Sequence, residues 1–261
     1  MADTNEGEYA WETIDLELRN ALGNAICNIC GSKGKKFTVK KLPYFDWANS
    51  FSGNLDLRES LVCEICGSSS RDRMFIRTLG QCLNEPGPLV KWNANKNIRI
   101  LESSGRRRHP QELELRYEYY NTEYIPEKIK TESRRYADFQ NLYFSDEHFD
   151  FVISSDVFEH IRLHKKALSE VHRVLKTDGK FILQVPYCDS WPKNYVKVRP
   201  DEKGDVFLTE PEYHSANTLV YRIYGKELNL ELKEAGFDVT YICKQIPEFM
   251  ISLQPIFICA K

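Results

Sequence analysis

Residues 144–187, FSDEHFDFVISSDVFEHIRLHKKALSEVHRVLKTDGKFILQVPY, decide the fold. Within this stretch, FDFVISS is apolar enough to form a strand that is buried on both faces. HKKALSEVHRVLK then places its apolar side chains at the spacing of an amphipathic helix. A TDGK turn leads into a second apolar strand, KFILQVPY. A strand, a helix and a strand in this order predict two parallel neighbours in one sheet.

The same alternation continues on both sides of this stretch, over residues 96–261. NIRILES and EYYNTEYI predict two earlier strands, and KELNLELKEAGF predicts a later helix that ends at Gly236. DVTYICKQI and IFICA predict the last two strands. We therefore expect an α/β domain with a Rossmann-like, doubly wound sheet.

The cysteines indicate a second module upstream of this domain. Four of the eight form two Cys-x-x-Cys pairs, Cys27 with Cys30 and Cys63 with Cys66, and each pair lies in the pattern C-x-I-C-G-S. Four thiolates with no open position make a structural Zn²⁺ site. Four buried cysteines without metal, or a redox pair, are the alternatives. We expect an N-terminal helix over 1–22, a zinc-ribbon-like module over 23–71, and a helix with a linker over 72–95.

Composition narrows the classes of partner. The 261 residues include 36 Lys and Arg against 38 Asp and Glu, a net charge of −2. This balance argues against a general binder of nucleic acid or of anionic membranes. No apolar run approaches the roughly 18 residues of a membrane span, and the acidic first twenty residues lack the apolar stretch of a signal peptide. We expect a cytoplasmic protein with no membrane partner; the oligomeric state stays open.

An ordered set of motifs carries a family resemblance. An acidic turn before F-D-x-V-I, then D-x-x-E-H, R-V-L-K-x-x-G and a strand ending in V-P resemble the class I S-adenosylmethionine-dependent methyltransferases of the type 11 kind. The resemblance covers about residues 97–245. Together with the cysteine pairs, it is similar to a group of zinc-ribbon methyltransferases. It implies a seven-stranded sheet with an antiparallel last strand, S-adenosyl-L-methionine as cofactor, and a methyltransferase domain over 96–261.

The cofactor is expected beyond the carboxyl ends of the strands, where the strand order reverses. The resemblance implies that Glu123 accepts hydrogen bonds from the ribose hydroxyls. It also implies that Asp138 and the Phe139 backbone face the adenine. The candidate cofactor-binding residues are Glu102, Ser103, Ser104, Gly105, Glu123, Tyr124, Asp138, Phe139, Ser155 and Asp156.

The first loop departs from the family pattern. The family usually has a glycine-rich loop after the first strand, because glycine lets the backbone approach the ligand closely. Here the loop reads Glu102-Ser103-Ser104-Gly105, with a single glycine. This departure leaves open a cofactor-free pseudoenzyme or binding protein.

Two histidines are the candidate catalytic residues. His160 follows Asp156 by four residues, so the two would share a face of a helix. His214 lies in the polar stretch TEPEYHSANT. That stretch belongs to an insertion, residues 187–220, which we expect to cover the acceptor. A histidine there would serve as a general base for a hydroxyl acceptor.

The favoured function is methyl transfer to an oxygen or nitrogen atom of a small polar acceptor, such as a sugar or another metabolite, by in-line displacement. A second hypothesis is an RNA or protein methyltransferase that docks through the zinc ribbon. The only feature favouring nucleic acid is a group of lysines around the first cysteine pair: Lys33, Lys35, Lys36, Lys40 and Lys41.

Overall fold

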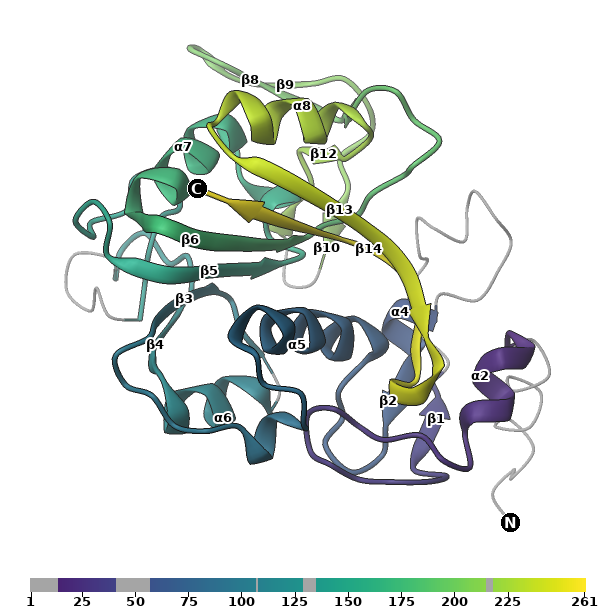
Figure 1. Ribbon diagram of the computed structural model, residues 1–261. Coiled ribbons are helices and arrows are strands. Elements are labelled where there is room, and N and C mark those ends of the chain that lie inside the picture. The colour runs from purple at the N-terminus through teal and green to yellow at the C-terminus, as the bar shows by residue number, and fades with distance from the viewer. Residues whose placement is uncertain (1–13, 41–56, 107, 129–134, 215–217) are drawn as a thin grey trace. The chain divides into compact units, whose positions relative to one another are not determined.

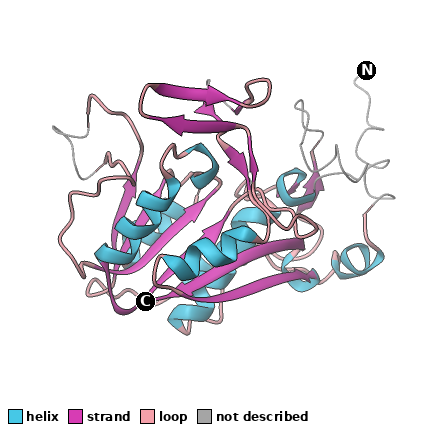
Figure 2. Ribbon diagram, turned by 90° about the horizontal axis from the view of Figure 1, so that it is seen from above, coloured by secondary structure: helices cyan, strands magenta, loops and turns pink. Residues whose placement is uncertain are grey.

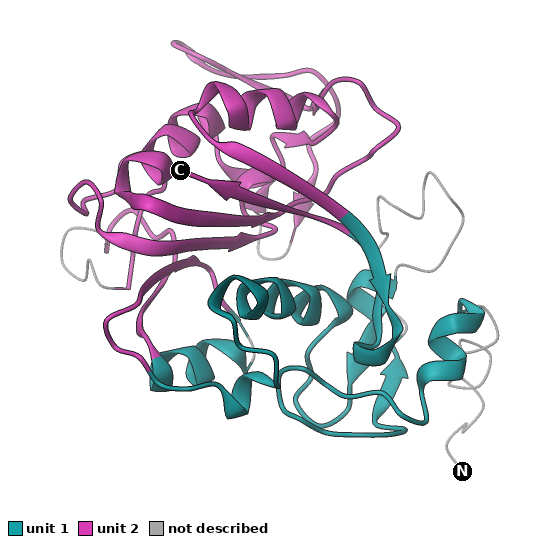
Figure 3. Ribbon diagram, in the orientation of Figure 1, with its two compact units in different colours: residues 1–94, 106–116, 243–254 teal, residues 95–105, 117–242, 255–261 magenta. Residues whose placement is uncertain are grey.

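The computed structural model describes residues 14–40, 57–106, 108–128, 135–214 and 218–261. Contacts divide the chain into two compact units (Figure 3). Unit 1 comprises residues 1–94, 106–116 and 243–254, and unit 2 comprises residues 95–105, 117–242 and 255–261. The units therefore interleave along the chain, and the domain boundaries expected from the sequence stay predictions. Among the described helices, none combines the length and apolar character that a bilayer crossing needs.

Unit 1 contains the cysteine pairs and short elements around them. Two short strands, β1 (Phe37–Val39) and β2 (Leu61–Cys63), pair antiparallel with Thr38 opposite Val62. The elements are α2 (Leu16–Ala21), β1 (Phe37–Val39), α4 (Leu57–Ser60), β2 (Leu61–Cys63), α5 (Ser70–Leu83), η1 (Leu89–Lys91), α6 (His109–Arg116) and η3 (Pro247–Phe249). The strand β1 has the sequence FTV and lies within residues 23–71, where a zinc-ribbon-like module is expected. Residues 1–13 of the expected N-terminal helix, and Lys41, lie outside the described residues.

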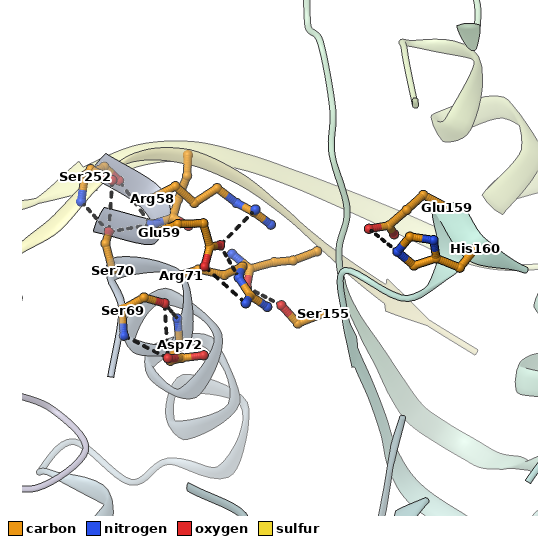
Figure 4. A network of polar contacts seen from close by, with 12 residues as sticks. Arg58, Glu59, Ser69, Ser70, Arg71, Asp72, Ser155, Glu159, His160 and Ser252 are labelled. Carbon is orange, nitrogen blue, oxygen red and sulfur yellow. Dashed lines mark hydrogen bonds and ion pairs between the residues drawn. The ribbon is translucent and has the colours of Figure 1, made fainter. Parts of the chain in front are cut away.

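The longest helix of unit 1, α5, begins at a capping box. The Ser69 side chain accepts a hydrogen bond from the Asp72 backbone, and the Asp72 side chain accepts one from the Ser69 backbone (Figure 4). This exchange satisfies two backbone N–H groups that have no partner within the helix. The helix ends at Asn84, which adopts a left-handed conformation. The helix therefore stops before the Pro-Gly-Pro stretch of residues 86–88.

Unit 2 is built on a mixed sheet in the order β13-β14-β6-β5-β3-β4 (Figure 1). The parallel strands are β3 (Arg99–Ser103), β4 (Glu118–Thr122), β5 (Phe149–Ser155) and β6 (Leu175–Gln184). They are followed by β13 (Asp238–Ile246) and β14 (Ile251–Ala260), whose outer ends group with unit 1. Because β14 pairs antiparallel with β6, the Rossmann-like sheet and its antiparallel last strand are confirmed.

The described part of the sheet has six strands, one fewer than the resemblance implied. In the seventh place, beside β4, a single parallel bridge joins Glu123 and Tyr136. The TDGK segment, residues 177–180, lies within β6 as an irregularity of that strand, where a turn before the strand was expected. The register between β5 and β6 shifts by several residues there, and Asp178 adopts a left-handed backbone with φ 64°.

Two helices cover one face of the sheet, α7 (His164–Val174) and α8 (Glu227–Glu234) (Figures 1 and 2). Their apolar faces contribute Leu168, Val171 and Leu232 to a buried core with Val152 and Phe181. The sequence periodicity predicted both helices. Six short strands lie between β6 and α8 and pair with one another, β7 with β12, β8 with β9 and β10 with β11. These are β7 (Tyr195–Val196), β8 (Val198–Asp201), β9 (Gly204–Phe207), β10 (Tyr213–His214), β11 (Thr218–Leu219) and β12 (Arg222–Ile223).

Candidate functional site

The four paired cysteines lie together in unit 1, with their sulfur atoms within 4.8 Å of one another. Cys27 Sγ is 3.7 Å from Cys66 Sγ, and Cys30 Sγ is 3.8 Å from Cys63 Sγ. A tetrahedron of sulfurs at the usual Zn–S distance of about 2.3 Å has edges of about 3.8 Å. The donor set and its spacing therefore fit a zinc ion without rearrangement.

The two knuckles have the same local structure. In each, the first cysteine's N–H donates to the serine carbonyl five residues later, at 2.8 Å for Cys27 and 2.9 Å for Cys63. Gly31 and Gly67 occupy the left-handed region with φ of 76° and 71°, which explains why glycine stands at both positions. The duplicated C-x-I-C-G-S pattern is thus a duplicated turn.

The serines of the two knuckles contact sulfur atoms across the cluster. Ser32 Oγ lies 3.2 Å from Cys30 Sγ and 3.4 Å from Cys63 Sγ, and Ser68 Oγ makes the equivalent contacts at 3.2 Å and 3.5 Å. Hydrogen bonding to neighbouring thiols raises the pKa of Cys27, and the bond from Cys27 lowers the pKa of Cys63. Four cysteines this close together could all ionise only with a cation between them.

Arg73 is a residue of this site that the sequence did not single out. It is completely buried, and its guanidinium donates to the backbone carbonyls of Ser68, Leu61 and Phe249. Burial lowers the pKa of Arg73, and electrostatic interaction with the cysteines opposes that shift. If the cluster held one zinc ion between four thiolates, this buried positive charge would partly offset the excess negative charge. The surrounding stretch, SRDRM, gives no local sign that Arg73 is buried.

The predicted cofactor residues gather at the carboxyl edge of the sheet in unit 2. The ends of β3, β4 and β5 coincide, because Ser103 pairs with Thr122 on one side and with Ser154 on the other. Ser103 Oγ donates to Ser154 Oγ at 2.7 Å. The chain leaves β3 for β4 on one side and returns to β5 on the other, so the strand order reverses here. This is the position at which open parallel sheets bind ligands.

Backbone conformation marks the same edge. Ser104, directly after β3, has φ 56°, and Asp156, directly after β5, has φ 52°. Non-glycine residues seldom adopt such angles, and those that do are concentrated at binding and active sites. The Ser104 N–H donates to the Thr122 carbonyl at 2.7 Å, and the Asp156 N–H donates to the Gln184 carbonyl at 3.0 Å. Bonds to neighbouring strands therefore hold both turns.

Glu102 and Gly105 form a closed arrangement under this loop. The Glu102 side chain is buried and accepts a hydrogen bond from the Tyr119 hydroxyl. A Cβ atom at Gly105 would lie 2.6 Å from the Glu102 carboxyl carbon. Asn121 binds both the N–H and the carbonyl of Gly105, at 2.8 and 2.9 Å. A side chain at position 105 would therefore have to displace the buried carboxylate of Glu102.

Glu123, Tyr124 and Asp138 come together beyond β4. Glu123 makes backbone hydrogen bonds with Arg135 and Ala137, at 2.8 and 3.0 Å, and these hold the segment that contains Asp138. Both Glu123 and Tyr124 have exposed side chains. Burial of its hydroxyl, and then the charge of Asp138, raise the pKa of Tyr124. The Phe139 ring is buried against Phe158, so only its backbone is available to a ligand.

The structure brings the two predicted catalytic histidines together. The rings of His160 and His214 lie edge to face with centroids 5.0 Å apart. His160 belongs to a 3-10 turn, η2 (Phe158–His160), and His214 belongs to the β10–β11 hairpin. Since Asp156 has a left-handed backbone, no helix runs from it to His160, and the expected shared helix face is wrong. Burial lowers the pKa of His160, and the charge of Asp156 opposes that shift.

Two buried residues hold this turn in place. Arg222 donates to the carbonyls of Ile161 and Arg162 at 2.7 and 3.1 Å, and the Tyr224 hydroxyl donates to the Phe158 carbonyl at 3.0 Å. Burial raises the pKa of Tyr224, so its hydroxyl stays a donor. Two aromatic residues of the insertion, Tyr195 and Tyr213, have exposed side chains. The sequence predicted neither the anchoring role of Arg222 nor the presence of Glu159 in this cluster.

Comparison with known proteins agrees with these observations at the level of a domain. Residues 104–183, under a third of the chain, match the family model described as "Methyltransferase domain". No curated protein matches the chain significantly. The match to this family model therefore supports the methyltransferase resemblance noted for residues 97–245. It covers the segment that contains β4, β5, α7 and most of β6.

Several solved structures are similar at low identity. The YcgJ protein of Bacillus subtilis is 15% identical, with a TM-score of 0.42, and the match covers 67% of this chain and 76% of that one. Phosphoethanolamine N-methyltransferase 2 of Haemonchus contortus is 18% identical, with a TM-score of 0.41, and the match covers 69% and 40%. A 1,6-didemethyltoxoflavin-N1-methyltransferase of Burkholderia thailandensis is 15% identical, with a TM-score of 0.39, over 86% and 93%. At these TM-scores, none carries an argument about the substrate of this chain.

Proposed function

The chain contains a methyltransferase domain of the S-adenosylmethionine-dependent class, and on that premise we propose that it methylates an oxygen or nitrogen atom of a small polar acceptor, such as a sugar or another metabolite. The observation that carries the proposal is the pair of left-handed turns at Ser104 and Asp156. They end two adjacent parallel strands at the position where the strand order reverses.

The residues at this edge fit the chemistry of the cofactor. S-adenosylmethionine, when bound, supplies a methyl group already activated by its sulfonium sulfur. The exposed carboxylate of Glu123 suits the ribose hydroxyls, and Asp138, held beside it, suits the adenine amine. With an activated donor, the protein mainly aligns the acceptor, and such alignment can supply about 7–11 kcal/mol of the barrier reduction.

His160 and His214 serve the acceptor in this proposal. Both belong to unit 2, and His160 follows the last residue of β5 by five residues, so the pair lies near the carboxyl end of that strand. A hydroxyl acceptor must lose its proton as the new bond forms, and a group that assists this step typically contributes about 10²–10⁴-fold. The two histidines are the groups we assign to that task.

The cysteine cluster has a structural role in this proposal. Cys27, Cys30, Cys63 and Cys66 would hold one Zn²⁺ ion with no open coordination position, which is the arrangement of structural sites. Cysteines that bind a metal and form no disulfide are also expected in a cytoplasmic protein.

Calorimetric titration with S-adenosylhomocysteine tests the cofactor site. We expect wild-type protein to bind it with micromolar affinity and the Glu123→Ala, Asp138→Ala variant to lose most of that affinity. The control is Glu202→Ala, Asp238→Ala, which removes two exposed acidic side chains of unit 2 and keeps the charge change equal. Absence of binding by the wild type would reject the enzyme and favour a cofactor-free binding protein.

A second candidate, methylation of RNA, rests on four exposed lysines near the first knuckle: Lys33, Lys35, Lys36 and Lys40. Exposed lysines usually contact only water, so the small acceptor is preferred. Nucleic acid that purifies with the protein and is released by salt would reverse that preference, because phosphate contacts weaken steeply as salt rises.

A further inference from the structure

The cluster around the two histidines contains a third group that can bind a metal. One ligand atom each from Glu159, His160 and His214 lie within 4.8 Å of one another. The Glu159 Oε1 atom is 3.6 Å from His160 Nε2, beyond hydrogen-bonding distance. Figure 4 shows the carboxylate of Glu159 turned toward this edge of the imidazole ring. Two nitrogen atoms and one carboxylate oxygen thus surround a common point.

Hydrogen bonds fix which nitrogen of His160 faces that point. His160 Nδ1 is 2.9 Å from the carbonyl oxygen of Leu219. A carbonyl oxygen can only accept, so Nδ1 carries a proton, and in the neutral ring Nε2 presents its lone pair to the cluster. Metal-binding histidines are oriented in the same way, with the second ring nitrogen donating to a carbonyl or a carboxylate.

His214 is oriented by a carboxylate in turn. Its Nε2 atom is 3.1 Å from Glu212 Oε1, and Glu212 also accepts a hydrogen bond from Lys197 Nζ at 2.6 Å. This arrangement leaves Nδ1 of His214 as the ligand atom. Glu212 is therefore a positioning residue for the cluster, through His214.

Exposure differs among the three side chains of the cluster. The Glu159 side chain has no exposed surface, whereas His160 is 14% and His214 is 35% exposed. The carboxylate therefore forms the closed side of the cluster. The exposed side of the two histidines leaves room for a further ligand, such as water or the acceptor. One closed side and one open side are typical of a catalytic metal site.

We propose that Glu159, His160 and His214 bind one divalent cation of the series from Mn²⁺ to Zn²⁺. Imidazole and carboxylate ligands suit these ions, and the absence of thiolate from this set distinguishes it from the cysteine cluster. The consequence for catalysis rests on the proposed function. A hydroxyl acceptor coordinated to the cation loses its proton more easily, and the proton passes to water. The two histidines then assist deprotonation as ligands of the cation, and water takes the proton in place of a histidine.

Manganese provides the test, because it discriminates against thiolate ligands. Full-length protein with one zinc ion per chain is titrated with Mn²⁺, and the free ion is followed by its paramagnetic resonance signal. We expect one further site per chain. His160→Gln and His214→Gln should each weaken Mn²⁺ binding at least tenfold. His164→Gln is the matched control, because His164 also contacts a carboxylate, Glu231 at 3.1 Å, outside the cluster.

A measurement on wild-type protein keeps the test independent of how the variants fold. Pulsed resonance of the bound Mn²⁺ should show coupling to imidazole nitrogen. Failure of Mn²⁺, Co²⁺ and Zn²⁺ to bind beyond the cysteine site would overturn the proposal, as would binding that survives both substitutions. Titration of the same samples with S-adenosylhomocysteine separates the two proposals. Cofactor binding without a second metal removes only the metal site, and a second metal without cofactor binding removes only the proposed function.

Discussion

Gly105 shows how one residue can keep a place in a family pattern for a different physical reason. Glycine at such a loop usually allows the backbone to approach a ligand. Here the space that a side chain would need is filled by the Glu102 carboxylate, 2.6 Å from the position of the missing Cβ. Because Asn121 also holds both polar backbone groups of Gly105, the loop has little freedom to move aside.

We therefore expect Gly105→Ala to lower the free energy of unfolding by about 1–3 kcal/mol, the usual cost of an overpacked site. The affinity for S-adenosylhomocysteine should fall as well, because the displaced loop directly follows β3, at the edge of the sheet where we propose that the cofactor binds. Urea denaturation and calorimetry measure the two effects. Gly87→Ala is the control, since a Cβ there would have no heavy atom within 4 Å. Equal stability of the two variants would contradict the packing argument.

Arg73 illustrates a residue whose role depends entirely on its environment. A guanidinium with no exposed surface is unusual, because burying an unpaired charge is costly. Arg73 meets this cost through hydrogen bonds to backbone carbonyls and through the nearby thiolates. Lysine would supply the charge, but it lacks the planar set of donors that reaches several carbonyls at once.

At the scale of elements, α7 holds the strand that leads to the histidine turn. Arg173, in its last turn, donates to the carbonyls of Leu142 and Phe144 and to the carboxylate of Glu170. Glu170 also accepts a hydrogen bond from the Leu142 N–H at 2.8 Å. One turn of helix thereby fixes the loop that enters β5. The hydrogen bonds from Arg173 lower the pKa of Glu170 below its usual value of 4.5.

This shift predicts a pH-dependent contribution to stability. A carboxylate with a lowered folded-state pKa stabilises the fold above its unfolded pKa, and loses that effect as the pH falls through the folded value. Glu170→Gln should cost about 1.5–3 kcal/mol at pH 7, as expected for hydrogen bonds to a charged group. The difference from wild type should shrink below about pH 4.5.

Unfolding by urea at a series of pH values measures this difference. Glu234→Gln is the control, because its side chain is 68% exposed and such surface changes usually stay within about 0.5 kcal/mol. A difference for Glu170→Gln that stayed constant from pH 7 to pH 3 would mean that packing, and not charge, explains its effect.

At the scale of the whole molecule, a different feature holds each unit together: an apolar core in unit 2 and the cysteine cluster in unit 1. Unit 2 has an extensive apolar core between the sheet and its helices. Unit 1 has short strands of three residues around the cysteine cluster. Small elements of this kind rarely bury enough apolar surface alone, so a metal commonly completes such a module.

Removal of zinc should therefore lower the thermal midpoint of the full chain. Zinc present at about a thousand times its Kd stabilises a folded site by about 4.1 kcal/mol. We expect one zinc ion per chain by metal analysis, released on titration of the thiols with a mercurial reagent. Cys63→Ser should reproduce the loss, whereas Cys243→Ser, at an exposed cysteine outside the cluster, should not. Purified protein with well under one zinc per chain would reject the site.

The sequence by itself determined the six strands of the main sheet, the helices α7 and α8, the two cysteine pairs and the resemblance to a methyltransferase domain, whereas it predicted neither α6 nor the short strands β7 to β12. These features repeat over short distances, and local periodicity or a duplicated motif is sufficient to reveal them. The ten cofactor candidates stay predictions, although their place at the sheet edge follows from the strand order.

Only the tertiary structure decided which distant groups meet. His214 reaches His160 because the β10–β11 hairpin returns Leu219 to the histidine turn. Glu159, next to His160 in the chain, was not distinguishable from an exposed acid until its burial was known. Such contacts depend on chain crossings and hairpin register. Those are set by the packing of the whole unit, and no local pattern encodes them.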